Sequence, residues 1–283
     1  MTGASVVPAL PAMNAGTLLR VLFKRPRRPV PDAMGELVTV YRLDRLPLDD
    51  IARYRAAFGF AGDAIPLSWW YLPAQRAHLA TMLDARFPFR IMGLVHMENT
   101  LAAYGAPDPD KPILLRTALR LLPPSTNGAL RCVLETSGSA DNAPIFSCTS
   151  TYLVRRGARS GGAKPVEAAS PSSAPAIAQW TLDAAAGRRY ARLSGDWNPI
   201  HLTGWSARLM GMRAPIIHGM HTLATACAAL ERAAGRRMAA IDCRFRAPVP
   251  LQGTASVSMG ETAGEFVVSS AGKPAVTGVY RLD

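Results

Sequence analysis

Asp196 and His201 are the residues whose types and spacing best suit acid/base chemistry in this chain. They lie five residues apart in SGDWNPIH, which covers residues 194–201. Pro199 disfavours a helical conformation at Asn198, so we expect the segment to fold back and bring the carboxylate and the imidazole to one side. A carboxylate can orient an imidazole, and a water molecule held between the two can be activated.

The same two residues also have simpler structural explanations. An aspartate before a proline turn often only caps the local backbone, and a histidine can be a hydrogen-bonded structural group. Ser194 is a weaker candidate as a nucleophile, because its surroundings lack the G-x-S-x-G pattern. From these residues alone, a water-activating pair and a structural pair both stay open.

A second element with chemical potential is the sequence Ile217-His218-Gly219-Met220, at the start of a long predicted helix. The N–H groups at a helix N-terminus have no intrahelical partner and carry the positive end of the helix dipole. Gly219 has no side chain, so a ligand oxygen can approach its N–H closely. This position therefore suits a donor to a thioester oxyanion.

His218 and His221 lie three residues apart on the same predicted helix, a spacing that raises the question of a metal site. No third ligand with suitable spacing is evident in the sequence. We therefore expect no metal and no cofactor.

The second half of the chain predicts one long helix followed by antiparallel strands. The helix starts at His218 and stops at Gly235. A short strand at 179–182, a short helix that Asp183 can cap and a second short helix near 204–210 precede it. Strand candidates follow at 238–247, 254–260, 264–270 and 274–281. This order is typical of an α+β domain.

The first half is a looser copy of this pattern and has no equivalent of SGDWNPIH. It predicts a helix at 73–83 and strands at 89–100, 113–122, 129–137 and 144–154. The stretch GARSGGAKPVEAASPSSAPA is rich in Gly, Ala, Ser and Pro and predicts a flexible linker. We therefore divide the chain into a basic arm at 1–30, a first domain at 31–156, the linker at 157–176 and a second domain at 177–283.

The composition bounds the class of protein. The chain has 283 residues, 49% hydrophobic and 18% charged, and a formal net charge of +12. These values suit a globular protein and exclude a disordered chain. No apolar run approaches the roughly 18 residues of a transmembrane helix. The basic charge suits a phosphate-bearing ligand, and without a nucleic-acid-binding motif we expect no nucleic acid partner.

The segment YARLSGDWNPIH, followed by Ala207, Gly211 and APIIHGM at 214–220, resembles the MaoC-like family of (R)-specific enoyl-CoA hydratases. That family's pattern is Y-A-x-x-S-G-D-x-N-P-[IL]-H, a short helix, and P-I-[IV]-H-G-M. CRFRAPV at 243–249 is similar to the family's strand after the helix. The resemblance covers about 190–250.

The resemblance implies an α+β double hot-dog fold, with two units that each wrap a long helix in an antiparallel sheet. The first unit would have lost its catalytic residues. The family pattern implies that Asp196 and His201 activate water and that the Gly219 N–H binds the thioester oxygen. Asn198, His218 and Phe245 would contact the substrate.

The implied activity is reversible hydration of a trans-2-enoyl-CoA to the (R)-3-hydroxyacyl-CoA, a lyase reaction of fatty acid metabolism. A dehydratase acting on acyl-carrier-protein thioesters and a non-catalytic thioester-binding protein are the alternatives. We expect a cytoplasmic protein and leave a homodimer open. Thr203 and Cys227 depart from the residues that many family members have at these positions.

Overall fold

The computed structural model describes residues 7–27, 35–126, 128–154 and 174–283. The chain forms two compact units, and both are discontinuous in sequence. Unit 1 consists of Met1–Leu48, Trp70–Val95 and Leu101–Arg155, and unit 2 consists of Asp49–Trp69, His96–Thr100 and Arg156–Asp283. Most of the predicted linker lies outside the described residues, so the domain boundaries from the sequence stay predictions.

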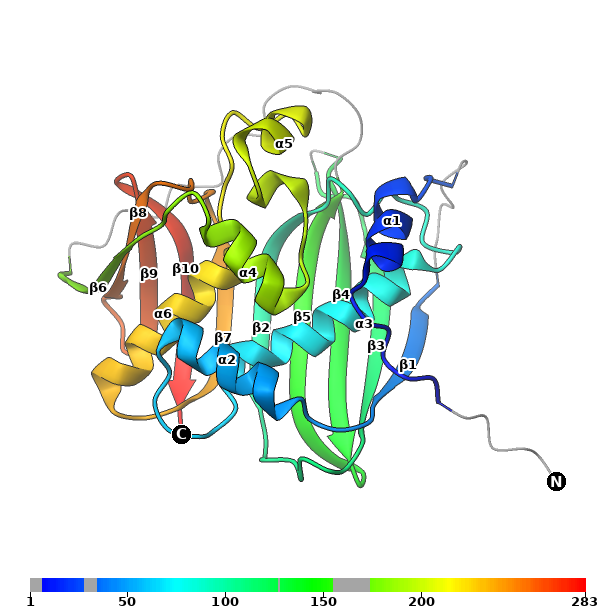
Figure 1. The fold of residues 1–283 in the computed structure, drawn as a ribbon, viewed down its shortest axis with the longest axis horizontal. Helices are drawn as coiled ribbons and strands as arrows, with labels where there is room; N and C mark the ends of the chain where they lie inside the picture. The colour runs from blue at the N-terminus through cyan, green and yellow to red at the C-terminus, as the bar shows by residue number, and fades with distance from the viewer. Residues whose placement is uncertain (1–6, 28–34, 127, 155–173) are drawn as a thin grey trace. The chain divides into compact units, whose positions relative to one another are not determined.

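Unit 1 contains an antiparallel sheet with a buried helix against it. Strands β1 (Leu37–Leu43), β3 (Ile113–Leu122), β4 (Leu130–Ala140) and β5 (Ala143–Val154) pair in that order. Strand β2 (Val95–Ala103) follows β5 in the strand order, and its residues His96–Thr100 belong to unit 2. Helix α3 (Tyr71–Leu83) crosses the sheet (Figure 1). Ala74, Ala77, His78 and Thr81 are completely buried along it. The helix therefore forms the centre of the unit.

Two further helices come from the N-terminal part of the chain. Helix α1 (Ala15–Phe23) packs on unit 1 through Val21. Helix α2 (Leu48–Phe58) and the 3-10 turn η1 (Leu67–Trp70) belong almost entirely to unit 2. Residues from the first half of the chain thus help to build the unit that carries the SGDWNPIH segment.

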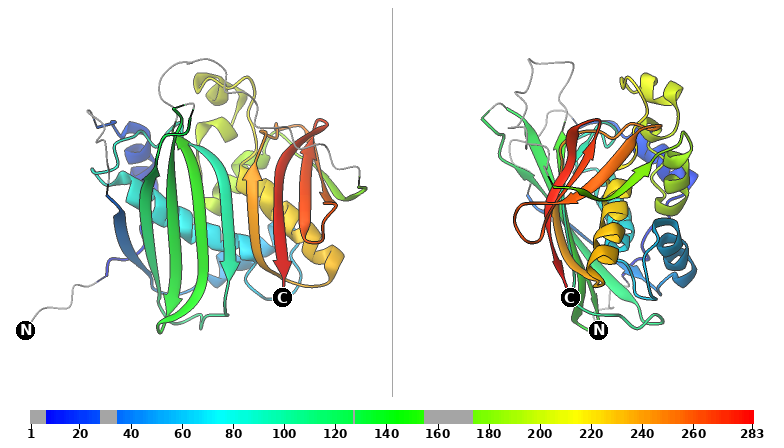
Figure 2. Two further views of the ribbon diagram at one scale, coloured as in Figure 1. Left: turned by 180° about the vertical axis from the view of Figure 1, so that it is seen from behind. Right: turned by 90° about the vertical axis from the view of Figure 1, so that its left-hand side faces the viewer.

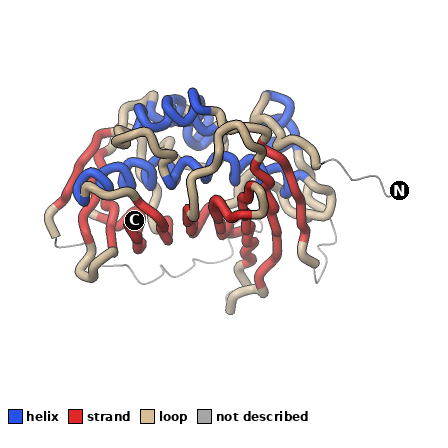
Figure 3. Tube along the Cα trace, turned by 90° about the horizontal axis from the view of Figure 1, so that it is seen from below, coloured by secondary structure: helices blue, strands red, loops and turns tan. Residues whose placement is uncertain are grey.

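Unit 2 repeats the arrangement of a long helix on an antiparallel sheet. Its strands are β6 (Ala176–Thr181), β7 (Met238–Phe245), β8 (Thr254–Met259), β9 (Glu265–Ser270) and β10 (Lys273–Leu282), in the order β7-β10-β9-β8-β6. Figure 2 shows the orange and red strands side by side. Helix α6 (Gly219–Ala234) lies on one face of these strands (Figure 1), and Figure 3 distinguishes the helices in blue from the strands in red. It ends where Gly235 adopts a positive φ of 63°.

A short helical segment carries the candidate chemistry in unit 2. It consists of α4 (Ala186–Ser194), the 3-10 turn η2 (Pro199–His201) and α5 (Gly204–Leu209). At Gly187 the backbone of α4 approaches η2 so closely that an added Cβ would lie 1.8 Å from the carbonyl oxygen of His201. Glycine is therefore the residue that lets α4 pack against η2.

The structure confirms most of the elements predicted from the sequence. The long helix, its stop at Gly235 and the four strands after it are present with small shifts at their ends. Strand β3 has the predicted bounds, 113–122. The expected α+β class is correct for both units.

Three details of the sequence interpretation were wrong. The strand predicted at 89–100 starts only at Val95 and continues to Ala103, because Phe89 and Ile91 join the buried core of unit 1 as irregular chain instead. Asp183 does not occupy the N-cap of α4, which is Ala185; its carboxylate accepts a hydrogen bond from the Ala185 N–H. Helices α1 and α2 and strand β1 were not predicted.

Among the described helices, none has both the length and the apolar character that crossing a bilayer would require.

The contact at Gly187 generates a stability prediction. Gly187→Ala should lower the free energy of unfolding by about 1–3 kcal/mol, because the new methyl group forces α4 and η2 apart. Gly204→Ala is the matched control, since a Cβ there meets nothing within 4 Å, and its effect should stay within about 1 kcal/mol. Urea unfolding of both variants measures this. Equal stabilities would contradict the close packing of α4 on η2.

Candidate active site

The end of α4 positions Asp196 through the side chain of Ser194. The Ser194 hydroxyl donates to the carbonyl oxygen of Tyr190 at 2.9 Å and accepts from the N–H of Asp196 at 3.1 Å. Gly195 leaves the helix with a positive φ of 74°, a conformation that glycine adopts without strain. The serine and the glycine of the motif thus turn the chain so that Asp196 follows the helix directly.

The Asn-Pro turn closes the loop between Asp196 and His201. The N–H of Asn198 donates to the Asp196 carboxylate at 3.1 Å, and the side-chain oxygen of Asn198 accepts from the N–H of Ile200 at 3.4 Å. Asn198 has ψ 123°, outside the helical region as predicted, and η2 begins at Pro199. The turn therefore delivers His201 back towards the carboxylate five residues earlier.

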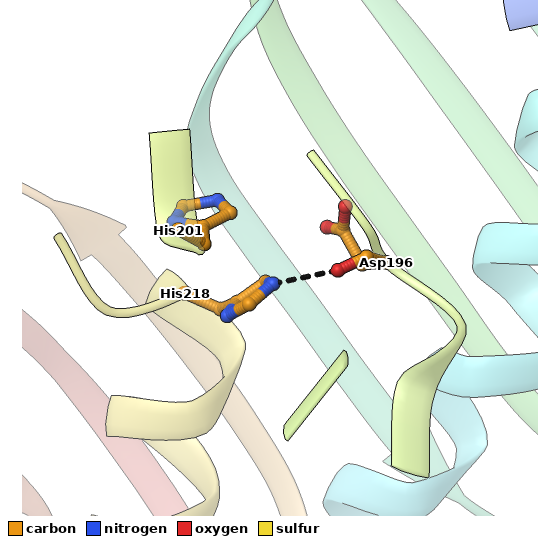
Figure 4. Close-up of side chains that lie close together, drawn as sticks. All are labelled: Asp196, His201 and His218. Atoms are coloured by element: carbon orange, nitrogen blue, oxygen red, sulfur yellow. Dashed lines mark hydrogen bonds between the residues drawn. The ribbon is translucent and has the colours of Figure 1, made fainter. Parts of the chain in front are cut away.

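Asp196, His201 and His218 form one cluster (Figure 4). One carboxylate oxygen and one nitrogen of each ring all lie within 4.8 Å of one another. The two imidazole rings stack with their centroids 3.8 Å apart. Nε2 of His218 donates to the backbone oxygen of Asp196 at 2.9 Å. His218 thus contacts both members of the predicted pair.

The hydrogen bond of His201 fixes its tautomer. Nδ1 of His201 lies 2.9 Å from the carbonyl oxygen of Ile216. Because a carbonyl oxygen can only accept, the proton must be on Nδ1, and the neutral ring then has a lone pair on Nε2. Burial lowers the pKa of His201 below its ordinary value of 6.5, against the opposing effects of the nearby Asp196 charge and the Ile216 carbonyl. The ring is therefore a neutral base at physiological pH.

The same reasoning applies to His218. Its Nε2 carries the proton, because it donates to a backbone carbonyl. Burial, followed by the proximity of His201, lowers the pKa of His218, while the charge of Asp196 acts in the opposite direction. Two stacked and buried imidazoles cannot both become cations at low cost. Both rings are accordingly neutral near pH 7.

The cluster also has the chemistry of a metal-binding group. A carboxylate and two imidazoles are donors that transition metals accept, and in the part of the chain that the structure describes this is the group whose donor atoms lie close enough to share a cation. Each ring has already committed one nitrogen to a backbone carbonyl. The expectation that the site works without a metal stays a prediction.

Gly219 begins α6 directly after His218, and its Cα faces the ring of Phe245. A Cβ at position 219 would lie 2.8 Å from that ring, closer than any side chain tolerates. The first N–H groups of α6 have no carbonyl four residues earlier to donate to. The role of the Gly219 N–H as a donor to a substrate oxygen therefore stays a proposal.

The structure brings together three of the six predicted site residues, namely Asp196, His201 and His218. Asn198 shapes the turn between the first two of these. Gly219 and Phe245 lie against each other at the start of α6. The roles of all six in catalysis and substrate binding remain proposals.

Three aromatic groups near the cluster were not predicted from the sequence. His96 in β2 is half-buried and its ring centroid lies 4.9 Å from that of Phe245. Burial lowers the pKa of His96 to about 4, while the charge of Asp196 acts in the opposite direction. The rings of Tyr190 in α4 and His218 pack in a T-shaped arrangement with their centroids 4.8 Å apart. The rings of Phe58, at the end of α2, and Tyr190 pack in the same way with their centroids 6.0 Å apart. Only Tyr190 had a sequence signal, as part of the family motif.

The two departures from the family pattern have local explanations. Thr203 is the N-cap of α5, where its hydroxyl accepts from the N–H of Ser206 in a reciprocal capping box. Cys227 is completely buried in α6, and burial raises the pKa of its thiol. Thr203 therefore stabilises a helix end, and Cys227 fills the core of unit 2 as an uncharged thiol.

Comparison with known proteins places these features in a family. Residues 168–273 match the model of the MaoC-like domain. The chain is 30% identical over 231 residues to 3-hydroxyacyl-thioester dehydratase X of Mycobacterium tuberculosis, covering 78% of this chain and 80% of that protein.

Solved structures agree with this match. The crystal structure of HtdX of Mycobacterium tuberculosis has a TM-score of 0.69 at 26% identity and covers 86% of this chain and 100% of that one. Another Mycobacterium tuberculosis protein, described as having a double hot-dog fold, has a TM-score of 0.57 at 13% identity and covers 86% of this chain and 95% of that one. The chain therefore belongs to the MaoC-like dehydratase family and has the double hot-dog fold.

Proposed function

We propose that the protein catalyses the reversible hydration of a trans-2-enoyl-CoA to the (R)-3-hydroxyacyl-CoA. The observation that carries this proposal is the neutral His201, whose ring lies in one cluster with the Asp196 carboxylate and whose Nδ1 is taken up by the Ile216 carbonyl. Membership of the MaoC-like family supports it, as does the relative named a 3-hydroxyacyl-thioester dehydratase. Acid/base groups at this separation suit the addition and removal of water.

In the proposed reaction a water molecule donates one hydrogen bond to Nε2 of His201 and the other to the Asp196 carboxylate. One of these groups removes a proton as the water oxygen attacks the β-carbon. The proton returns to the α-carbon on the same face, so that the elements of a single water add across the double bond. Dehydration follows the same path in reverse.

The negative charge that develops in this reaction is placed on the thioester oxygen. We assign its stabilisation to the N–H of Gly219, at the positive end of the α6 dipole. Asn198 and Phe245 line the substrate site in this proposal.

His218, expected from the sequence to contact the substrate, is here proposed to be a positioning residue as well, rather than a proton carrier. Its ring stacks on His201, and its Nε2–H holds the backbone of Asp196. It therefore keeps the two reacting groups at a fixed separation while remaining neutral.

Two alternatives are kept for the same site. The net charge of +12 suits the phosphates of CoA as well as the acidic surface of an acyl carrier protein, so a carrier-protein dehydratase is the second candidate. A non-catalytic thioester-binding protein would have no use for an intact acid/base pair with a fixed tautomer.

Substitution of the pair tests the chemistry. Asp196→Asn and His201→Ala should each reduce kcat/KM for crotonyl-CoA hydration by roughly 10²–10⁴, the usual contribution of a general acid or base. Asp183→Asn, which also changes a carboxylate to an amide but on the exposed surface of unit 2, should keep wild-type activity.

Near wild-type rates in both pair variants would refute the proposed mechanism. Activity of the wild type on carrier-protein thioesters but not on CoA thioesters would instead favour the second candidate and leave the mechanism intact.

The role of Gly219 can be separated from its packing against Phe245. Gly219→Ala should lower kcat by roughly 10²-fold, because a methyl group keeps the thioester oxygen from a donor of the kind whose loss costs that much. Phe245→Leu relieves the clash with the new methyl group, and the rate of the double variant should remain far below that of Phe245→Leu alone. Full recovery in the double variant would show that Gly219 serves packing only.

A further inference from the structure

Helix α1 carries three large apolar side chains on its outer surface. Leu19, Leu22 and Phe23 are 54%, 45% and 75% exposed, whereas Val21 is buried in the core of unit 1. The three lie at positions i, i+3 and i+4, so they share one face of the helix. A contiguous exposed apolar face of this kind marks a surface that binds something.

Hydrogen bonds hold the chain on both sides of α1, so the outward orientation of the three side chains is a property of the fold. Asn14 caps α1 by accepting from the N–H of Thr17. The Arg76 guanidinium donates to the carbonyl oxygens of Leu10 and Pro11, each at 2.9 Å.

The other end of the arm is fixed in the same way. Nζ of Lys24 donates to the carbonyl oxygen of Asp84 at 2.9 Å, and the N–H of Arg27 donates to that of Pro88. Hydrogen bonds therefore attach the chain on both sides of α1 to the rest of unit 1, and the buried Val21 packs the middle of the helix against the core.

Exposed basic residues lie on α1 and in the chain directly after it. Arg20, Arg25 and Arg27 are exposed, and the sequence has no acidic residue before Asp32. None of the ion pairs found among the described residues includes these three arginines. The surface thus combines protruding apolar groups with unneutralised cations.

We propose that α1, together with Arg25 and Arg27 after it, binds the surface of an anionic lipid bilayer. A nine-residue helix is about 13 Å long and cannot cross a bilayer. It can lie in the interface, with Leu19, Leu22 and Phe23 among the upper acyl chains and the arginines at the anionic headgroups. This surface goes beyond the proposed enzymatic function and does not depend on it.

The charge pattern favours lipid over the other occupants. A second copy docked through the same face would bring the arginines of both copies into one interface, a like-charge arrangement that opposes association. Nucleic acid would use the arginines but would leave the three apolar side chains in water. An anionic bilayer accommodates both features at once.

Sedimentation with lipid vesicles tests the proposal with the full chain. The wild type should bind vesicles of equal parts phosphatidylglycerol and phosphatidylcholine, and should bind pure phosphatidylcholine at least tenfold more weakly. The variant Leu19→Ser/Leu22→Ser/Phe23→Ser and the variant Arg25→Gln/Arg27→Gln should each lose at least tenfold in binding. Val21 is untouched in both, so the thermal midpoint should be preserved.

The matched control is Leu48→Ser/Arg236→Gln, which removes an exposed leucine and an exposed arginine elsewhere and should bind as the wild type does. Absent vesicle binding, or binding unchanged in both α1 variants, overturns the proposal. So does a wild-type dimer that the triple serine variant dissolves, or α1-dependent capture of an acidic carrier protein without vesicle binding.

Discussion

Two hydrogen bonds from imidazole rings to backbone carbonyls underlie the rest of the candidate site. His201 donates through Nδ1 to Ile216, and His218 donates through Nε2 to Asp196. Since carbonyl oxygens cannot donate, these contacts set both tautomers and leave the other nitrogen of each ring as an acceptor. Burial then keeps both rings neutral. The result is a base next to a carboxylate, prepared before any substrate arrives.

The fold supports this arrangement through close backbone packing. The absence of a side chain at Gly187 lets α4 lie against η2, which holds His201. The Ser194 hydroxyl links the end of α4 to the backbone of Asp196. The turn at Asn198 then brings His201 back towards Asp196. Gly195, Ser194 and Asn198 of the motif thus each have a structural task that positions the proposed acid/base pair.

The motif allowed the sequence to predict the local part of the site, because its contacts join residues close in the chain. Asp196, Asn198 and His201 belong to one turn, and His218 and Gly219 belong to one helix start. His96 and Phe58 were missed because they reach unit 2 from the first half of the chain, and no periodicity marks such long-range contacts. Helix α1 was missed because the prolines after it obscured a helical pattern whose single buried residue is Val21.

The tautomer and charge of His201 test the account most directly, and nitrogen NMR of ¹⁵N-histidine-labelled protein measures both. A His201→Gln variant assigns the signal. The account predicts a neutral ring with its proton on Nδ1 at pH 7, which becomes a cation only as the pH falls below 6.5, because burial lowers the pKa of His201. A proton on Nε2, or a cationic His201 at pH 7, would contradict it.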